Sequence, residues 1–96
     1  MKTIYILEDD TGIRDALQLL LSFENYDVRS FSTISAFTER DKSIVPDLFI
    51  FDVMMPDGLG TDVCNQTKND PLSATVPVMI ISAHAKNDDV VKSCDA

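Results

Sequence analysis

The chain has 96 residues, 45% of them hydrophobic and 25% charged, which is the size and composition of one small globular domain. Its formal net charge of −8 argues against a surface that binds nucleic acid, because phosphate contacts need clustered lysine and arginine. The opening stretch MKTIYILEDD holds too short an apolar run for a signal peptide or a membrane span, so we predict a cytoplasmic protein.

Strands and helices are predicted to alternate along the whole chain. Strands are expected where apolar and β-branched residues run together, and helices where apolar residues recur at helical spacing. In chain order the predicted elements are strand 3–7, helix 13–24, strand 26–31, helix 33–42, strand 47–51, helix 61–69, strand 77–82 and helix 88–96. Asp10 or Thr11 is the expected N-cap of the first helix, and Ser32 that of the second, because such side chains accept bonds from first-turn amides.

This alternation predicts βαβ units. The strands at 47–51 and 77–82 are continuously apolar, as in a parallel sheet covered on both faces. Right-handed crossovers then produce a doubly wound α/β sheet. We therefore predict one such domain over residues 1–96, with its ligand site outside the carboxyl ends of the strands.

The two cysteines, Cys64 and Cys94, lack the spacing of a metal site or a CxxC motif. We predict that both are free thiols in a reducing compartment, since cysteine commonly packs as a small hydrophobic residue.

Polar residues follow three of the apolar strands. Glu8 and Asp9 follow the first predicted strand, Asp52 follows the third, and Ser82 ends the fourth. The ends of parallel strands meet at one edge of a sheet, so the three acids are expected to cluster beside a hydroxyl. Mg²⁺ would offset their repulsion, and a carboxylate can be the nucleophile in phosphoryl transfer. A single such acid is more often a turn former or a helix cap, but all four residues together favour a metal-dependent phosphoryl site.

The loop after Asp52 reads VMMPDGLG. Pro56 fixes its own φ, while Gly58 and Gly60 permit positive φ, so we expect a stiff turn that holds a backbone group next to the acid. A plain turn into the following helix is compatible with the same residues.

Three stretches, YILEDDTGIR, PDLFIFDVMMPDGLG and VPVMIISAHA, resemble the receiver domain of bacterial two-component response regulators, the chemotaxis-regulator-like family. The resemblance implies a flavodoxin-like sheet of order 2-1-3-4 and a phosphorylation-dependent switch, not an enzyme, that assists its own phosphorylation and dephosphorylation. It implies Mg²⁺ as cofactor and, as partners, a sensor histidine kinase and a downstream output domain or target protein. Direct contact of this domain with nucleic acid or a membrane is not expected.

The resemblance also assigns roles to individual residues. These are Asp52 as phosphoacceptor and metal ligand, Asp9 as a direct Mg²⁺ ligand, Glu8 as a ligand through water, Met54 as a ligand through its backbone carbonyl, and Ser82 as the switch hydroxyl. Met54 and His84 match positions that tune the lifetime of the phosphoryl group, although for His84 an exposed loop side chain is the favoured interpretation.

The chain departs from the family pattern at its end. Relatives carry a lysine-proline pair at the end of a fifth strand and then a fifth helix, whereas this chain stops at Ala96, and neither Lys86 nor Lys92 follows a fifth strand. We therefore expect a truncated receiver that lacks the fifth strand and helix. The edge of strand 77–82 would then be exposed and prone to self-association.

Two other functions remain open. An aspartyl-phosphate-type hydrolase needs a second acid two residues after the nucleophile, where this chain has Met54. A receiver-like scaffold that is never phosphorylated fits the missing lysine. Nucleotide and flavin enzymes are disfavoured, because the sequence has neither G-x-G-x-x-G nor G-x-x-x-x-G-K-[ST].

Overall fold

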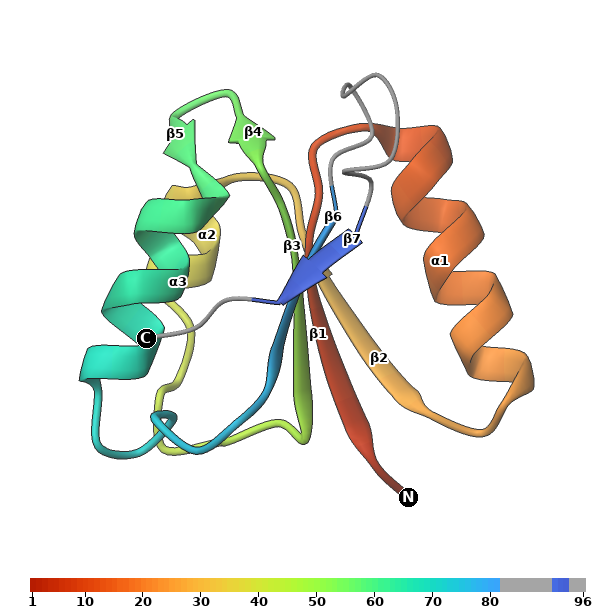
Figure 1. Ribbon diagram of the computed structural model, residues 1–96. Coiled ribbons are helices and arrows are strands. Elements are labelled where there is room, and N and C mark those ends of the chain that lie inside the picture. The colour runs from red at the N-terminus through yellow and green to blue at the C-terminus, as the bar shows by residue number, and fades with distance from the viewer. Residues whose placement is uncertain (82–90, 94–96) are drawn as a thin grey trace.

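A five-stranded sheet is the framework of the molecule (Figure 1). Its strands, in the order β2-β1-β3-β6-β7 across the sheet, are β2 (Asp27–Phe31), β1 (Thr3–Leu7), β3 (Leu48–Asp52), β6 (Val78–Ile81) and β7 (Val91–Ser93). The first four are parallel, so the predicted doubly wound sheet of order 2-1-3-4 is confirmed. The computed structural model describes residues 1–81 and 91–93, and the predictions for Ser82, His84 and Lys86 lie outside these residues.

Helices cover the two faces of the sheet (Figure 1). One face carries α1 (Thr11–Phe23), and the other carries α2 (Ile34–Thr38) and α3 (Gly60–Asn69). A short antiparallel hairpin, β4 (Met54–Met55) and β5 (Gly58–Leu59), separates β3 from α3 and was not predicted. Within the described part of the chain, none of the helices is both long enough and apolar enough to cross a membrane.

The helix caps follow from local hydrogen bonding. Asp10 caps α1 as predicted, because its Oδ1 accepts from the Ile13 amide at 3.0 Å. The predicted cap of α2 is wrong by one residue: Thr33, not Ser32, accepts from the Ala36 amide.

Helix α2 is also shorter than predicted, ending at Thr38. The reason lies just beyond it. Asp41 accepts bonds from the amide and the hydroxyl of Ser43, at 3.0 and 2.6 Å, and so holds a turn that competes with continuation of the helix.

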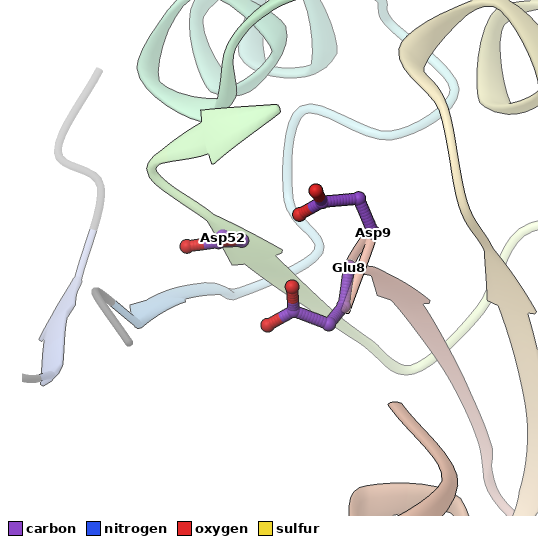
Figure 2. Close-up of side chains that lie close together, drawn as sticks. All are labelled: Glu8, Asp9 and Asp52. Atoms are coloured by element: carbon purple, nitrogen blue, oxygen red, sulfur yellow. The ribbon is translucent and has the colours of Figure 1, made fainter. Parts of the chain in front are cut away.

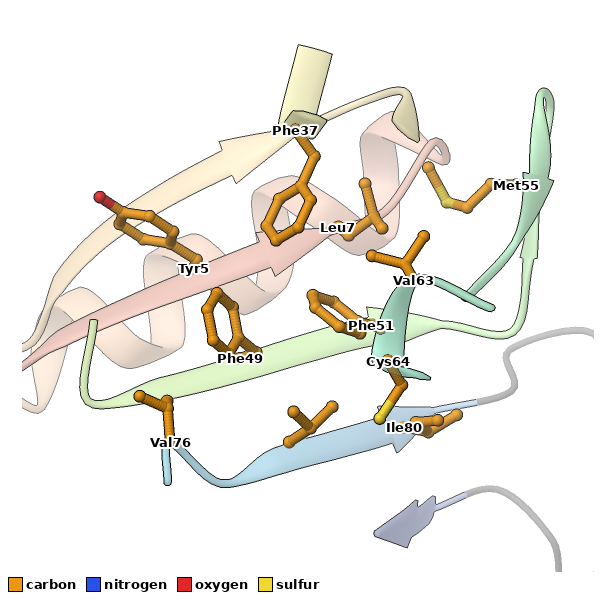
Figure 3. Packing of buried hydrophobic residues seen from close by; sticks show 11 residues of the cluster. Tyr5, Leu7, Phe37, Phe49, Phe51, Met55, Val63, Cys64, Val76 and Ile80 are labelled. Atoms are coloured by element: carbon orange, nitrogen blue, oxygen red, sulfur yellow. The ribbon is translucent and has the colours of Figure 1, made fainter. Parts of the chain in front are cut away.

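The larger core lies between the sheet and helices α2 and α3 (Figure 3). Phe37 of α2 is 2% exposed and packs edge-on against three rings, with centroid distances of 5.3 Å to Phe31, 5.8 Å to Phe49 and 5.2 Å to Phe51. Edge-on packing is the favoured arrangement of aromatic pairs. These contacts join α2 to β2 and β3, so the core holds in place the strand ends from which the following loops begin.

Strand β7 overturns the predicted helix at residues 91–93, while the rest of the predicted range 88–96 lies outside the described residues. Val91–Ser93 pair antiparallel with β6, with Ile81 opposite Val91 and Met79 opposite Ser93. The open edge of β6 offers unpaired backbone groups, and β-branched residues favour strands, so pairing prevails over the helical pattern at these three residues.

This pairing also changes two further expectations. The edge of β6 is covered along Met79–Ile81, so the exposed edge from which self-association was predicted is absent there. The expectation that no further strand follows β6 in the sheet is wrong, because β7 pairs antiparallel with it.

Cys64 lies fully buried in α3 and is disulfide-bonded. The prediction of a free thiol is therefore wrong for Cys64, while Cys94 lies outside the described residues. Disulfide formation depends on the separation of two thiols in space, which their spacing in the sequence does not reveal.

The end of α1 provides a test of backbone strain. Asn25 follows the helix with φ of 67°, in the left-handed region, and its amide donates to the Ser22 carbonyl at 3.0 Å. We expect Asn25→Val to lower the free energy of unfolding by about 1–2 kcal/mol, because a β-branched residue strains this conformation. The matched variant Asn25→Gly should be at least as stable as the parent. Urea unfolding checks both, and equal stabilities of the two variants would contradict the argument.

Candidate metal centre

Three carboxylates meet where β1 and β3 end (Figure 2). Glu8 and Asp9 directly follow β1, and Asp52 is the last residue of β3. Because Leu7 pairs with Phe51, the two parallel strands end at the same level. One carboxylate oxygen from each of the three residues lies within 4.8 Å of the others. The structure thus brings together three of the residues that the sequence singled out.

Burial makes this cluster electrostatically unfavourable when it is fully charged. Glu8 and Asp52 are 0% exposed, whereas Asp9 is partly exposed. Burial raises the pKa of Glu8 to about 7, the Asp10 amide that donates to it opposes the shift, and the nearby Asp52 adds to it. Near neutral pH Glu8 is therefore partly protonated, because burial beside Asp52 disfavours its charged form.

Several oxygens of the cluster have no hydrogen-bond partner among the described residues. They are Glu8 Oε1, Asp9 Oδ1 and both carboxylate oxygens of Asp52, all of them buried. Glu8 Oε2, by contrast, accepts a bond from the Asp10 amide at 3.1 Å. Buried carboxylate oxygens without donors are costly, and a hard divalent cation supplies what they lack. Mg²⁺ prefers such oxygen ligands, so these residues fit it chemically.

The loop after Asp52 is held by a close approach of its own backbone. Gly60 donates its amide to the Val53 carbonyl at 2.8 Å, and a Cβ built on Gly60 would lie 1.9 Å from the Asp52 carbonyl oxygen. Gly60 is therefore required for space, and not for the positive φ that the sequence predicted. Gly58 does adopt a positive φ, of 155°.

Met54 begins the hairpin two residues after Asp52, pairing with Leu59. Its side chain is 57% exposed, so the apolar group does not fill the acidic cluster.

Sequence reasoning missed two residues near the site. Arg14 of α1 donates from Nη1 to the carbonyl of Glu8 at 3.0 Å and to that of Asp9 at 3.4 Å, placing a cation behind the acidic pair. Asp57, in the turn of the hairpin, accepts bonds from the first turn of α2. Neither contact has a local signal in the sequence, because each depends on the path of the chain between its partners.

Comparisons of the sequence with known proteins identify the family to which the chain is similar. A family model described as the response regulator receiver domain matches residues 4–96. The chain is 31% identical over 88 residues to the transcriptional regulatory protein CreB of Escherichia coli K12, over 92% of this chain and 38% of that protein. It is 34% identical over 93 residues to the response regulator protein TodT of Pseudomonas putida, over 97% of this chain and 40% of that protein. The chain thus spans about two fifths of the length of these relatives.

Solved structures show the same fold. The receiver domain of HemR from Leptospira biflexa superposes with a TM-score of 0.80 at 27% identity, over 90% of this chain and 68% of that one. The response regulator TrrA from Thermotoga maritima, solved in complex with Mg²⁺ and a beryllium fluoride, superposes with a TM-score of 0.70 at 26% identity, over 85% of this chain and 68% of that one.

Proposed function

The chain belongs to the response regulator receiver family, the phosphoaccepting domains of two-component signalling, and we propose that Asp52 is its phosphoacceptor, with a sensor histidine kinase as donor and Mg²⁺ as cofactor. One observation carries the proposal most strongly. Asp52 is fully buried at the end of β3 beside Glu8 and Asp9, and neither of its carboxylate oxygens has a partner among the described residues.

The chemistry assigned to Asp52 is nucleophilic. A carboxylate oxygen of Asp52 bonds to the phosphorus of a phosphohistidine, the phosphorus–nitrogen bond breaks, and its electron pair returns to the imidazole. The product is an acyl phosphate on Asp52. Mg²⁺ held at this cluster would supply the neutralisation of charge on the phosphoryl oxygens, which is the main requirement of such a transfer.

The residues of the cluster differ in how they would hold the ion. In this proposal Asp9 and Asp52 bind it directly, the Met54 backbone carbonyl adds a third oxygen, and Glu8 acts through water. The division between the two acids is supported by their surroundings. One oxygen of Glu8 already accepts a bond from the Asp10 amide, whereas Asp9 Oδ1 is buried and has no partner among the described residues.

The domain acts in this proposal as a switch. Phosphorylation shifts the population between two conformations of a binding surface, with Ser82 as the hydroxyl that bonds the phosphoryl group and an output domain or target protein as the reader. Its catalytic contribution is limited to its own phosphorylation and dephosphorylation. That this domain makes no direct contact with nucleic acid remains a prediction.

The test is intact-mass analysis after incubation with Mg²⁺ and acetyl phosphate, a small acyl-phosphate donor. We expect one phosphate adduct on the parent and none on Asp52→Asn. Asp62→Asn, which removes an exposed acid from the first turn of α3, is the matched control and should be modified like the parent. Omitting Mg²⁺ should abolish the adduct. A folded parent that acquires no adduct, or an Asp52→Asn variant that does, would refute the assignment.

A further inference from the structure

Asp57 joins the hairpin that follows Asp52 to helix α2. Its Oδ1 accepts from the Ile34 amide at 2.9 Å, and its Oδ2 accepts from the Ser35 amide at 3.0 Å. The Ile34 amide lowers the pKa of Asp57 and the Ser35 amide adds to this, so the carboxylate is charged at neutral pH. An isolated five-residue helix is unstable and has four free amides at its start, so α2 depends on such external acceptors.

Apolar atoms make a second contact between the same two segments. A Cβ built on Gly58 would lie 2.9 Å from Cδ1 of Ile34, which places the tip of the hairpin directly against α2. Ile34 itself packs on the larger core. The hairpin is therefore attached to a part of the molecule that the core already holds in place.

Two attachments thus fix the chain between Asp52 and α3. At the base, the Gly60 amide donates to the Val53 carbonyl at 2.8 Å. At the tip, Asp57 bonds α2. Met54 lies between these two attachments and pairs with Leu59 in the hairpin, so its backbone is restrained from both ends.

We propose that Asp57 is a positioning residue for the metal site: by tying the β4–β5 hairpin to α2, it restrains the backbone of Met54, whose carbonyl the proposed function assigns to the ion. This inference rests on the function proposed above. Thermodynamic coupling is reciprocal: since the bond between Asp57 and α2 strengthens ion binding, ion binding must strengthen that bond. The stability of α2 is therefore coupled to Mg²⁺ binding.

The experiment measures Mg²⁺ affinity without any phosphoryl donor, by calorimetry on the parent, Asp57→Ala and Asp57→Asn. We expect the dissociation constant to rise about three- to tenfold in Asp57→Ala, the scale of one lost cap, and less in Asp57→Asn, whose amide oxygen still accepts a bond. Asp41→Asn is the matched control. It removes an exposed, hydrogen-bonded acid from the connection between α2 and β3, and should bind Mg²⁺ as the parent does.

Amide hydrogen exchange distinguishes coupling between Asp57 and the ion from a purely structural role of Asp57. Saturating Mg²⁺ should slow exchange at Ile34 and Ser35 in the parent, and this slowing should disappear in Asp57→Ala. Unchanged affinity in both Asp57 variants, or no effect of Mg²⁺ on these two amides in the parent, would overturn the inference while leaving the proposed function intact. Failure of the parent to bind Mg²⁺, with no difference from Asp52→Asn, would instead overturn the metal site and this inference with it.

Discussion

Replacing Gly60 with alanine is expected to lower the free energy of unfolding by about 3 kcal/mol and to abolish phosphorylation of Asp52. The added methyl group would lie 1.9 Å from the Asp52 carbonyl oxygen and 2.9 Å from its carbonyl carbon, so it meets backbone and not a side chain that can rotate away. Either the end of β3 or the start of α3 must move. A shift at the end of β3 displaces the carboxylate of Asp52 from Glu8 and Asp9.

Gly12→Ala is the matched control for this change. A Cβ on Gly12 would approach only Asp10 Oδ1, at 3.3 Å, and Gly12 lies in the first turn of α1. Alanine is favoured over glycine in a helix by up to about 1 kcal/mol, so this variant should unfold at a similar or higher urea concentration than the parent. Equal destabilisation by the two substitutions, or a Gly60→Ala variant that retains parental stability, would contradict the steric argument.

The second large effect concerns pH. Without Mg²⁺, the parent is expected to lose stability on the order of 1–3 kcal/mol between pH 5 and pH 8, and Glu8→Gln is expected to lose much less. Burial raises the pKa of Glu8 to about 7 from an ordinary value of 4.5. Between these values the native state binds a proton that the unfolded state has released. The stabilisation is therefore complete below pH 4.5 and is lost as the pH rises through 7.

Urea unfolding at several pH values measures this loss. Glu39→Gln, which neutralises an exposed glutamate at the end of α2, should keep the parental pH dependence. Adding Mg²⁺ should restore stability at pH 8 in the parent, because the ion binds the deprotonated cluster in the native state. A Glu8→Gln variant with the same pH dependence as the parent would show that another group is responsible.

Local signals in the sequence predicted most of the sheet and the position of the acidic cluster. The apolar runs at β1, β3 and β6 are recognisable because strands buried on both faces must be apolar throughout. Asp10 identified the start of α1 because a cap acts on amides only three residues away. Parallel strands ending at one edge then placed Glu8, Asp9 and Asp52 together, without any knowledge of the side-chain packing.

Contacts between distant residues were decided only by the tertiary structure. Residues 91–93 follow a helical pattern, yet they form β7 because an open strand edge lies beside them. Asp57 reads as an ordinary turn residue until the chain brings it to amides 22 and 23 residues away. Gly60 reads as a flexible residue, but it is needed because the Asp52 carbonyl leaves no room for a side chain. The sequence alone thus determined which elements form and which strand ends carry acids, because those signals act over a few residues. Edge pairing, steric clearance and the attachment of the site's loop depend on separations in space, which exist only once the chain has folded.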